Sequence, residues 1–83
     1  MANIIPFVGA VHLFAFDFAP DGWATCEGQL LEMDENRALF ALLGTKFGGD
    51  GVSTFALPDL RGEAPPNLQY CIALQGIYPR AGV

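Results

Sequence analysis

The stretch Val8–Phe18 reads Val-Gly-Ala-Val-His-Leu-Phe-Ala-Phe-Asp-Phe, and most of the fold follows from it. Ring-bearing side chains alternate with small or aliphatic ones, so an extended chain would sort them onto opposite sides. The first set is His12, Phe14, Phe16 and Phe18, and the second is Val11, Leu13 and Ala15. The alternation predicts a β-strand with two apolar faces. In so short a chain, we expect a second subunit to cover one of them.

A turn and two short strands are expected directly after this stretch. Ala19–Gly22 carries proline at its second position and glycine at its last, which is typical of a type I turn. Trp23–Cys26 and Gln29–Leu31 have strand-like patterns and flank Glu27-Gly28, a relative of the Asp-Gly hairpin signal. The pattern therefore predicts two short strands joined by a hairpin turn.

One helix is expected over Glu35–Leu43. Asp34 can accept hydrogen bonds from the free amides at the helix start, and Gly44 can adopt the left-handed conformation that ends a helix. Leucines recur at spacings of three and four residues, which predicts an apolar stripe that packs on the sheet. These leucines are Leu39, Leu42 and Leu43.

The second half of the chain adds a loop and two extended segments. Gly48–Gly51 is expected to be a glycine loop, followed by the extended segment Val52–Leu57. Residues 63–69 resemble a linker, and Tyr70–Gln75 returns to strand-like alternation. The expected fold class is therefore α+β: a small single domain with short strands and hairpins packed on one helix, and oligomeric.

Composition points to association with copies of the same chain. Of the 83 residues, 52% are hydrophobic and only 16% are charged, so polar cover is scarce. A domain of this size buries only about 60% of its unfolded surface, so apolar side chains are expected to lie against neighbouring subunits. The net charge is -5 and the four basic residues are scattered, which excludes a basic face for nucleic acid.

The uncharged stretch Ile4–Phe16 is too short for a membrane span. It contains Pro6 and Gly9, and it falls below the ~20 residues that a transmembrane helix needs. No Lys or Arg precedes Arg37, so a secretory signal peptide is not expected. We expect the protein in an extracellular or virion-like particle, reached without that signal, and in the cytoplasm before release.

The N-terminal segment 1–10 is expected to join another subunit, with residues 11–83 forming the domain. A domain this small has little core left for a further apolar segment, which would be an aggregation hazard if exposed. A neighbouring subunit would accept it along a sheet edge, giving an open polymer, or three copies would pack around an axis as a closed trimer. The predicted assembly interface is Ile4, Ile5, Phe7, Val8, Val11, Leu13 and Phe14.

The residues that usually carry catalysis, metal or cofactor binding do not form such a pattern here. Val52 follows the last glycine of the loop, where a phosphate-binding loop needs lysine and a hydroxyl residue. His12 is the only histidine, which excludes a zinc site within one chain; copies of it could meet on a symmetry axis, although a packed or edge histidine is the expectation. No enzyme activity and no cofactor are predicted.

Two residue pairs have a predicted structural role. Cys26 and Cys71 are the only cysteines, and they form either a disulfide or two small buried thiols, of which the second is the commoner arrangement. Asp59 and Arg61 lie two residues apart and project to the same side of an extended segment. We expect them to anchor that loop, because a guanidinium forms bidentate bonds to carboxylates.

Several motifs together resemble the phage tail collar domain, which occurs in short tail fibres and in stand-alone microcystin-dependent proteins. The resemblance covers most of residues 6–62 and resumes at the C-terminal strand. The motifs that carry it include Phe18-Ala19-Pro20, Gly22-Trp23-Ala24, Cys26-Glu27-Gly28-Gln29-Leu30-Leu31, Phe47-Gly48-Gly49-Asp50-Gly51, Leu57-Pro58-Asp59-Leu60-Arg61-Gly62 and Tyr70-Cys71-Ile72-Ala73-Leu74-Gln75-Gly76.

This resemblance implies a non-enzymatic α+β domain that trimerises in fibres and links a shaft to a receptor-binding tip. Relatives carry a long variable segment after the Asp-Leu-Arg-Gly motif, and this chain has only residues 63–69 there. A structural subunit that self-assembles into a fibre is therefore the leading expectation. The alternative is an adhesin of a phage tail or injection apparatus, which binds a cell-surface receptor or glycan.

Overall fold

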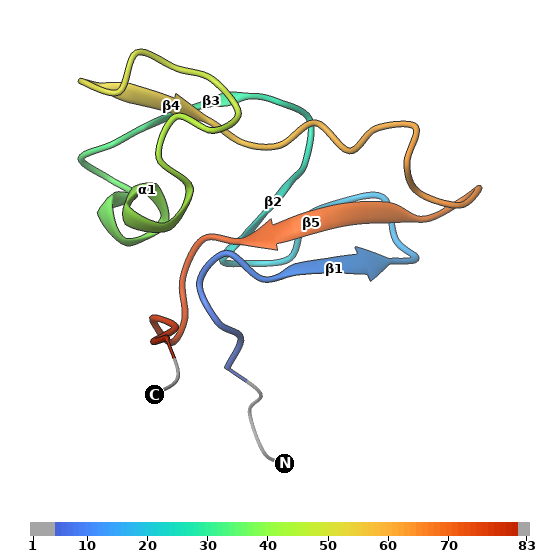
Figure 1. Ribbon diagram of the computed structural model, residues 1–83. Coiled ribbons are helices and arrows are strands. Elements are labelled where there is room, and N and C mark those ends of the chain that lie inside the picture. Colours follow the sequence, from blue (N-terminus) through green and yellow to red (C-terminus); the bar gives the residue numbers. More distant parts are fainter. Residues whose placement is uncertain (1–4, 82–83) are drawn as a thin grey trace.

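The computed structural model describes residues 5–81, which form five short strands and one short helix (Figure 1). The chain is a small mixed α+β domain, as its sequence predicts. The strands are β1 (Val11–Phe14), β2 (Trp23–Thr25), β3 (Leu30–Glu32), β4 (Thr54–Ala56) and β5 (Gln69–Ala73), and the helix is α1 (Arg37–Leu43). No helix within residues 5–81 is long and apolar enough to cross a membrane.

β5 is the central strand of a three-stranded antiparallel sheet with the order β1-β5-β2. Ile72 of β5 lies opposite Val11 of β1 on one side and opposite Ala24 of β2 on the other. The near-C-terminal strand is thus inserted between two strands from the first third of the chain (Figure 1). The alternating pattern predicted this strand over Tyr70–Gln75, and the observed one begins one residue earlier and ends two residues earlier.

β1 is shorter than the strand predicted over Val8–Phe18. The backbone N–H of Gly9 and the C=O of Ala10 both bond to Ala73, so two residues oppose one at this point. Such a bulge interrupts the regular ladder before β1 begins. After β1 the chain bends, and the backbone carbonyls of Phe16 and Phe18 accept hydrogen bonds from the side-chain amide of Gln69.

β3 and β4 form a separate two-stranded antiparallel sheet, with Leu31 opposite Phe55. The predicted hairpin around Glu27-Gly28 is therefore wrong, because the strand before it joins β5 and the strand after it joins β4. Gly28 has a positive φ of 76°, and its backbone passes so close to Asp59 that an added Cβ would lie 3.3 Å from the Asp59 Cβ. The chain uses this glycine to cross from one sheet to the other.

α1 begins at Arg37, two residues later than predicted. Asp34 does not cap it: its carboxylate accepts from the Arg37 guanidinium at 2.8 Å, and Asn36 occupies the N-cap position without a side-chain capping bond. The end of the helix is as predicted. Gly44 has a φ of 56°, and its N–H donates to the carbonyl of Phe40.

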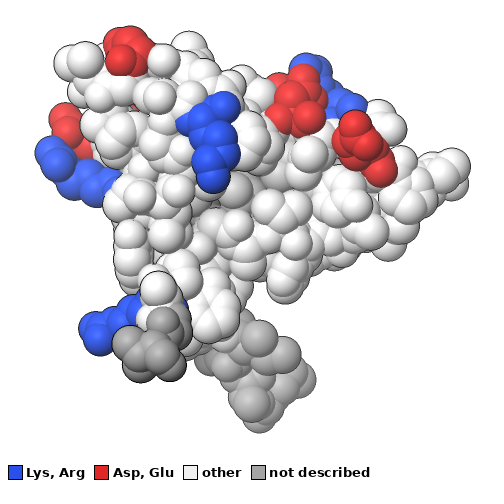
Figure 2. All heavy atoms as spheres, viewed as in Figure 1, with Lys and Arg blue, Asp and Glu red and all other residues white. Residues whose placement is uncertain are grey.

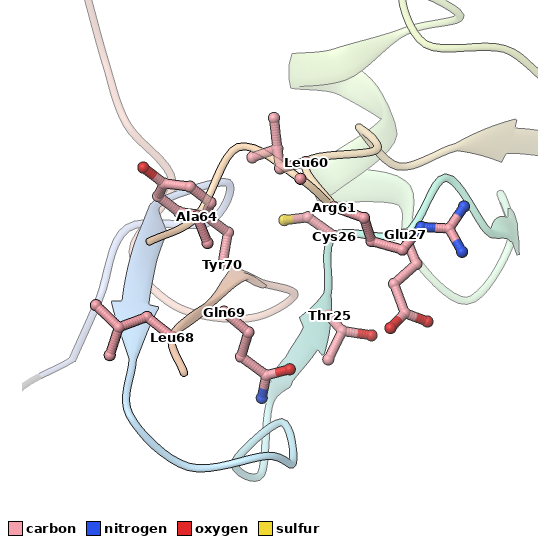
Figure 3. Close-up of a pocket in the computed structure, with 10 residues that line it drawn as sticks. Thr25, Cys26, Glu27, Leu60, Arg61, Ala64, Leu68, Gln69 and Tyr70 are labelled. Carbon is pink, nitrogen blue, oxygen red and sulfur yellow. The ribbon is translucent and has the colours of Figure 1, made fainter. Parts of the chain in front are cut away.

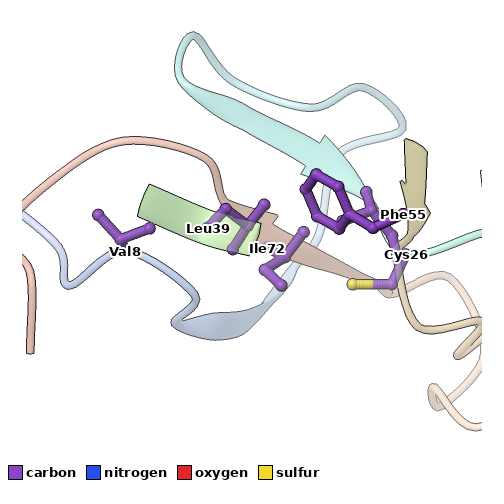
Figure 4. Close-up of a cluster of buried hydrophobic side chains, with 6 residues drawn as sticks. Val8, Cys26, Leu39, Phe55 and Ile72 are labelled. Carbon is purple, nitrogen blue, oxygen red and sulfur yellow. The ribbon is translucent and has the colours of Figure 1, made fainter. Parts of the chain in front are cut away.

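The core lies between α1 and the two sheets. Figure 4 shows Leu39 of α1 and Ile72 of β5 pointing toward each other, with Val8 at one end and Phe55 and Cys26 at the other. All five side chains are buried, and no polar or charged side chain among residues 5–81 is buried with them. Truncating a leucine at such a site usually costs about 2–5 kcal/mol, so this cluster carries much of the stability of the fold.

The described part of the N-terminal segment is paired with the chain's own C-terminal segment. Val8 N–H donates to Ile77 C=O at 2.9 Å, Ile77 N–H donates to Pro6 C=O at 2.9 Å, and Phe7 and Ile77 form a parallel bridge. Residues 6–10 therefore make backbone hydrogen bonds to residues 73–77 of the same chain, at and just after the end of β5. That segment 1–10 also joins another subunit stays a prediction.

Residues 63–69 form ordered turns rather than an open linker. Glu63 N–H donates to Leu60 C=O, and Leu68 N–H donates to Pro65 C=O. Asn67 has a positive φ of 67°, a conformation that asparagine tolerates better than most residues. The segment delivers the chain to the start of β5 after two successive turns.

Candidate functional site

Five ring-bearing side chains form a row that begins on one face of the three-stranded sheet and continues along the bend after β1, and we call them the aromatic strip. They are His12, Phe14, Phe16, Phe18 and Trp23. The ring centroids of Phe14 and Phe16 lie 5.0 Å apart, and those of Phe16 and Phe18 lie 4.7 Å apart. Trp23 meets Phe14 edge to face at 5.2 Å. These separations are typical of packed aromatic pairs, so the strip is one continuous row.

The central strand explains why the rings gather there. On this face β5 carries the small side chains of Cys71 and Ala73, which lie opposite His12 and Trp23 respectively, and Gln69 at its start, opposite Phe14. The large rings of the outer strands cover Cys71 and Ala73, and both small residues are fully buried. The far end of the row stays open to solvent, because Phe18 is 60% exposed.

A second apolar group lies where residues 5–7 meet residues 77–78, and we call it the terminal patch. Its members are the exposed side chains of Ile5, Phe7, Ile77 and Tyr78. A hollow of about 240 Å³ lies between this patch and Trp23 of the aromatic strip. It is lined by Ile5, Pro6, Gly22 and Trp23 together with Asp21, Gln75 and Gly76. The two apolar groups therefore adjoin each other across a hollow that has polar side chains in its wall.

The predicted interface residues are distributed unequally between these two apolar groups and the core. Val8 points into the core and is 5% exposed, so its side chain is not available for contact with another subunit. Ile5 and Phe7 belong to the terminal patch, and Phe14 belongs to the strip. Ile4 lies outside the described residues. Sequence reasoning missed Ile77 and Tyr78, since only the pairing of the two ends of the chain brings them beside Phe7.

Val11 and Leu13 lie on the opposite face of β1, at the edge of the sheet, and both are exposed. Figure 2 shows most of the acidic and basic groups of this face over the upper part of the molecule and one basic group near its C-terminal end, while the surface over β5 and β1 in this view carries none. Val11 and Leu13 are aliphatic, so their side chains would not oppose burial of this edge.

Asp59 and Arg61 pair with each other at the surface. The Arg61 Nε and a terminal nitrogen donate to the two Asp59 carboxylate oxygens at 3.0 and 2.8 Å, and the Arg61 backbone N–H donates to the same carboxylate. This holds the pKa of Asp59 down at about 2. The Arg61 side chain is 65% exposed, so the predicted anchor is a local clamp of one turn, and exposed pairs of this kind contribute little stability.

Asp50 organises the glycine loop, a role that the sequence analysis missed. One carboxylate oxygen accepts from the backbone N–H groups of Val52, Ser53 and Thr54 at 2.8–2.9 Å, and the other accepts from the Ser53 hydroxyl. These bonds hold the pKa of Asp50 well below its usual range. An aspartate followed by glycine and hydroxyl residues is typical of such turns, and this signal was present in the sequence.

Cys26 and Cys71 are free and buried. The Cys26 N–H bonds to Tyr70 C=O, whereas Cys71 lies opposite Thr25, so the alternation of the sheet directs the two thiols to opposite faces. Burial raises the pKa of the Cys26 thiol to about 11, with a further contribution from Cys71. Two thiols in this arrangement behave as small core residues.

A pocket of about 230 Å³ lies between β2 and the turns that lead to β5. Figure 3 shows the polar ends of Thr25, Glu27 and Gln69 on one side of it, and the apolar Leu60 and Ala64 on the other. The described residues 5–81 contain no cluster of His, Cys, Asp or Glu that could hold a metal ion. The polar groups of Thr25, Glu27 and Gln69 allow the pocket to form hydrogen bonds with a small polar molecule.

The comparison with known families gives one match. A model of the family described as Phage Tail Collar Domain matches residues 9–65, which is more than half of the chain. The matched range begins at the bulge before β1, includes both sheets except β5, and ends in the turns after Arg61. The search of curated proteins found no match.

Proposed function

Because the chain belongs to the phage tail collar domain family, we propose that it is a non-enzymatic structural subunit that assembles with copies of itself into a fibre. The family has a structural role in phage tail fibres, which associates the chain with a virion or tail-like particle. Self-assembly is the further step, and it depends on the surface of this particular chain.

The observation that carries the proposal is the uncovered apolar surface formed by the aromatic strip and the terminal patch. Monomeric proteins rarely expose large contiguous apolar areas, and such areas mark interaction sites. Phe7, Phe18 and Ile77 are each at least half exposed, although they lie beside aromatic or aliphatic neighbours that a contact would bury together with them. Burial of apolar surface contributes roughly 25 cal/mol per Å², so a second copy covering this surface gains substantial free energy.

The composition of this surface favours a copy of the same chain as the partner. With a net charge of -5, two chains repel each other unless their contact avoids the acidic groups. No member of the aromatic strip or the terminal patch is Asp, Glu, Lys or Arg, so a contact between these groups meets this condition, with Asp21 in the hollow between them. Either a closed trimer or an open polymer would bury the exposed apolar side chains of this surface.

Light scattering of the purified protein over a range of concentrations tests the proposal. We expect particles several times heavier than the 8.9 kDa chain, and electron microscopy of the same sample separates small closed particles from filaments. Phe16→Asp should shift the population toward monomers, because it places a charge within the aromatic strip. Val52→Asp is the matched control, since Val52 is 83% exposed in the glycine loop and belongs to neither apolar group. A wild-type protein that stays at 8.9 kDa at every concentration would contradict self-assembly.

A second function, adhesion, is supported by the pocket beside Thr25 and Gln69. Its volume of about 230 Å³ and its mixture of polar and apolar walls suit one sugar ring of a surface glycan. Binding on a glycan array that is lost in Thr25→Val, with unchanged particle mass, would establish adhesion as an additional role. Equal glycan binding by the wild type and by Thr25→Val would show that this pocket is not the binding site.

A further inference from the structure

The outer edge of β1 presents backbone groups that the described chain does not pair. β5 directs the backbone groups of Cys71 and Ala73 toward β1, as the bond from Ala73 N–H to Ala10 C=O shows. In an antiparallel ladder the bonded residues alternate with residues whose groups point away. The N–H and C=O groups of Val11 and Leu13 therefore point outward, and no bond within residues 5–81 reaches them.

Two of the four corresponding groups on β2, the other edge of this sheet, are already used. Trp23 N–H donates to Pro20 C=O at 2.9 Å, and the C=O of Thr25 accepts from the Gln29 side chain at 2.8 Å. The two edges of the second sheet are protected differently. Along β4, the Ala56 N–H donates to Gly48 C=O and the Gly51 N–H donates to Thr54 C=O, so the glycine loop occupies that edge. Along β3, the edge carries the charged side chain of Glu32. Among the described strands, β1 is the one with no bond to any of its four outward backbone groups, and it carries no Asp, Glu, Lys or Arg.

Natural proteins usually protect an open edge strand with a lysine, a proline, a bulge or an inward-pointing charge. β1 has none of these within Val11–Phe14, and the bulge at Gly9 precedes the strand. Figure 1 shows β1 at the margin of the sheet, with β5 on one side of it and no element on the other. An edge of this kind is suited to receive another strand.

We propose that β1 pairs with β1 of a second copy of the chain, in the antiparallel direction about a two-fold axis, and this inference rests on the self-assembly proposed above, in its open-polymer form. A two-fold contact by itself closes a dimer, so further copies join the pair through the aromatic strip and the terminal patch. The pairing joins two three-stranded sheets into one continuous sheet. Val11 lies opposite Leu13 of the other copy, and the two residues exchange both of their N–H···O=C bonds. His12 lies opposite its own copy on the axis, in a position without direct backbone bonds.

The limits of β1 select this register. Sliding the strands toward the N-terminus would bring in Gly9, whose N–H already bonds to Ala73 C=O. Sliding them the other way would bring in Ala15, where the chain bends away. Only the register centred on His12 keeps both Val11 and Leu13 opposite regular strand residues. It also joins the two aromatic strips edge to edge, because His12 is the member of each strip nearest the axis.

Cysteine cross-linking tests the register. His12→Cys should form a covalent dimer on mild oxidation, because directly opposed residues that are not hydrogen-bonded approach within the range of a disulfide. Val11→Cys alone should not cross-link, since its copy lies more than about 7 Å away in this register. A mixture of Val11→Cys and Leu13→Cys chains should give the mixed dimer. The unmodified protein, with its buried Cys26 and Cys71, is the control and should stay uncross-linked.

Amide hydrogen exchange provides an independent reading of the edge. The N–H groups of Val11 and Leu13 should be protected in the assembled protein and exchange rapidly in a dilute, monomeric sample. Leu13→Lys should abolish both the protection and the cross-link, while Ala15→Lys, just beyond the strand, should preserve them. Thermal melting of both variants verifies that they fold.

The outcomes separate this inference from the proposed function. Assembled particles in which His12→Cys fails to cross-link, or in which Val11→Cys cross-links equally well, would overturn strand pairing and leave self-assembly intact. If the N–H groups of Val11 and Leu13 stayed protected in dilute monomers, they would be bonded within the same chain, and this result would overturn strand pairing between copies. Monomers under all conditions would overturn both proposals.

Discussion

His12 of β1 and Trp23 of β2 meet across the central strand β5, with their ring centroids 5.2 Å apart. Their strands are not neighbours, so the contact spans the width of the sheet above Cys71 and Ala73. The small size of these two residues leaves the space that the rings occupy. A sheet face that would otherwise be solvated is in this way partly covered by the chain itself.

This contact makes Trp23 a larger contributor to stability than the exposed rings of the same strip. Trp23→Ala uncovers the buried residues Cys71 and Ala73 and removes the ring contacts with His12 and Phe14. We expect it to lower the free energy of unfolding by about 2–3 kcal/mol. Phe18→Ala, at the exposed end, should cost under about 1 kcal/mol. Urea denaturation at a concentration where both variants are monomeric measures the difference. Equal losses would mean that the ring of Trp23 does not cover the sheet.

Gly76 controls the pairing of the two ends of the domain. Its φ is 143°, and an added Cβ would collide with the carbonyl oxygen of Pro6, which accepts from Ile77 N–H. We expect Gly76→Ala to cost more than about 2 kcal/mol and to expose the Val8 and Ile77 amides to exchange. Gly62→Ala is the control, because Gly62 also has a positive φ but open space around it; its cost should be about 1 kcal/mol. Similar effects of the two changes would argue against the collision.

The glycine loop should lose stability in acid through Asp50. The pKa of its carboxyl is lowered in the folded state, so the stabilisation is complete above the unfolded pKa of about 3.9 and is lost as the pH falls further. At pH 7, Asp50→Asn should melt at a lower temperature than the wild type, and the difference should shrink below about pH 4. A constant difference from pH 7 to pH 2 would exclude the charge of Asp50 as the cause.

Both thiols should be unreactive in the folded protein. The raised pKa of Cys26 keeps it protonated near neutral pH, and both side chains are buried. A thiol reagent at pH 8 should label neither cysteine in buffer and both in denaturant. The melting temperature should be the same with and without a reducing agent. A lower melting temperature in the reducing sample would reveal a disulfide, which the placement of the two side chains on opposite faces opposes.

The sequence by itself determined the local elements, because their signals act over a few residues. The alternation around Val11–Phe14 and the strand at Tyr70 were predicted from it, and so was the helix end at Gly44. Its apolar composition also indicated a surface that needs a partner. The motifs from Phe18 to Gly62 were sufficient to indicate the family, since they are specific as a set.

Only the tertiary structure decided which strands pair and which apolar residues stay outside. The segment around Glu27 has the pattern of a hairpin, yet β2 pairs with the longer strand β5, and β3 pairs with β4. Val8 and Phe7 are neighbours of similar hydrophobicity, but one is in the core and the other is exposed, because the bonds to Ile77 set the direction of each side chain. Burial depends on contacts between residues some seventy positions apart, and no local pattern encodes them.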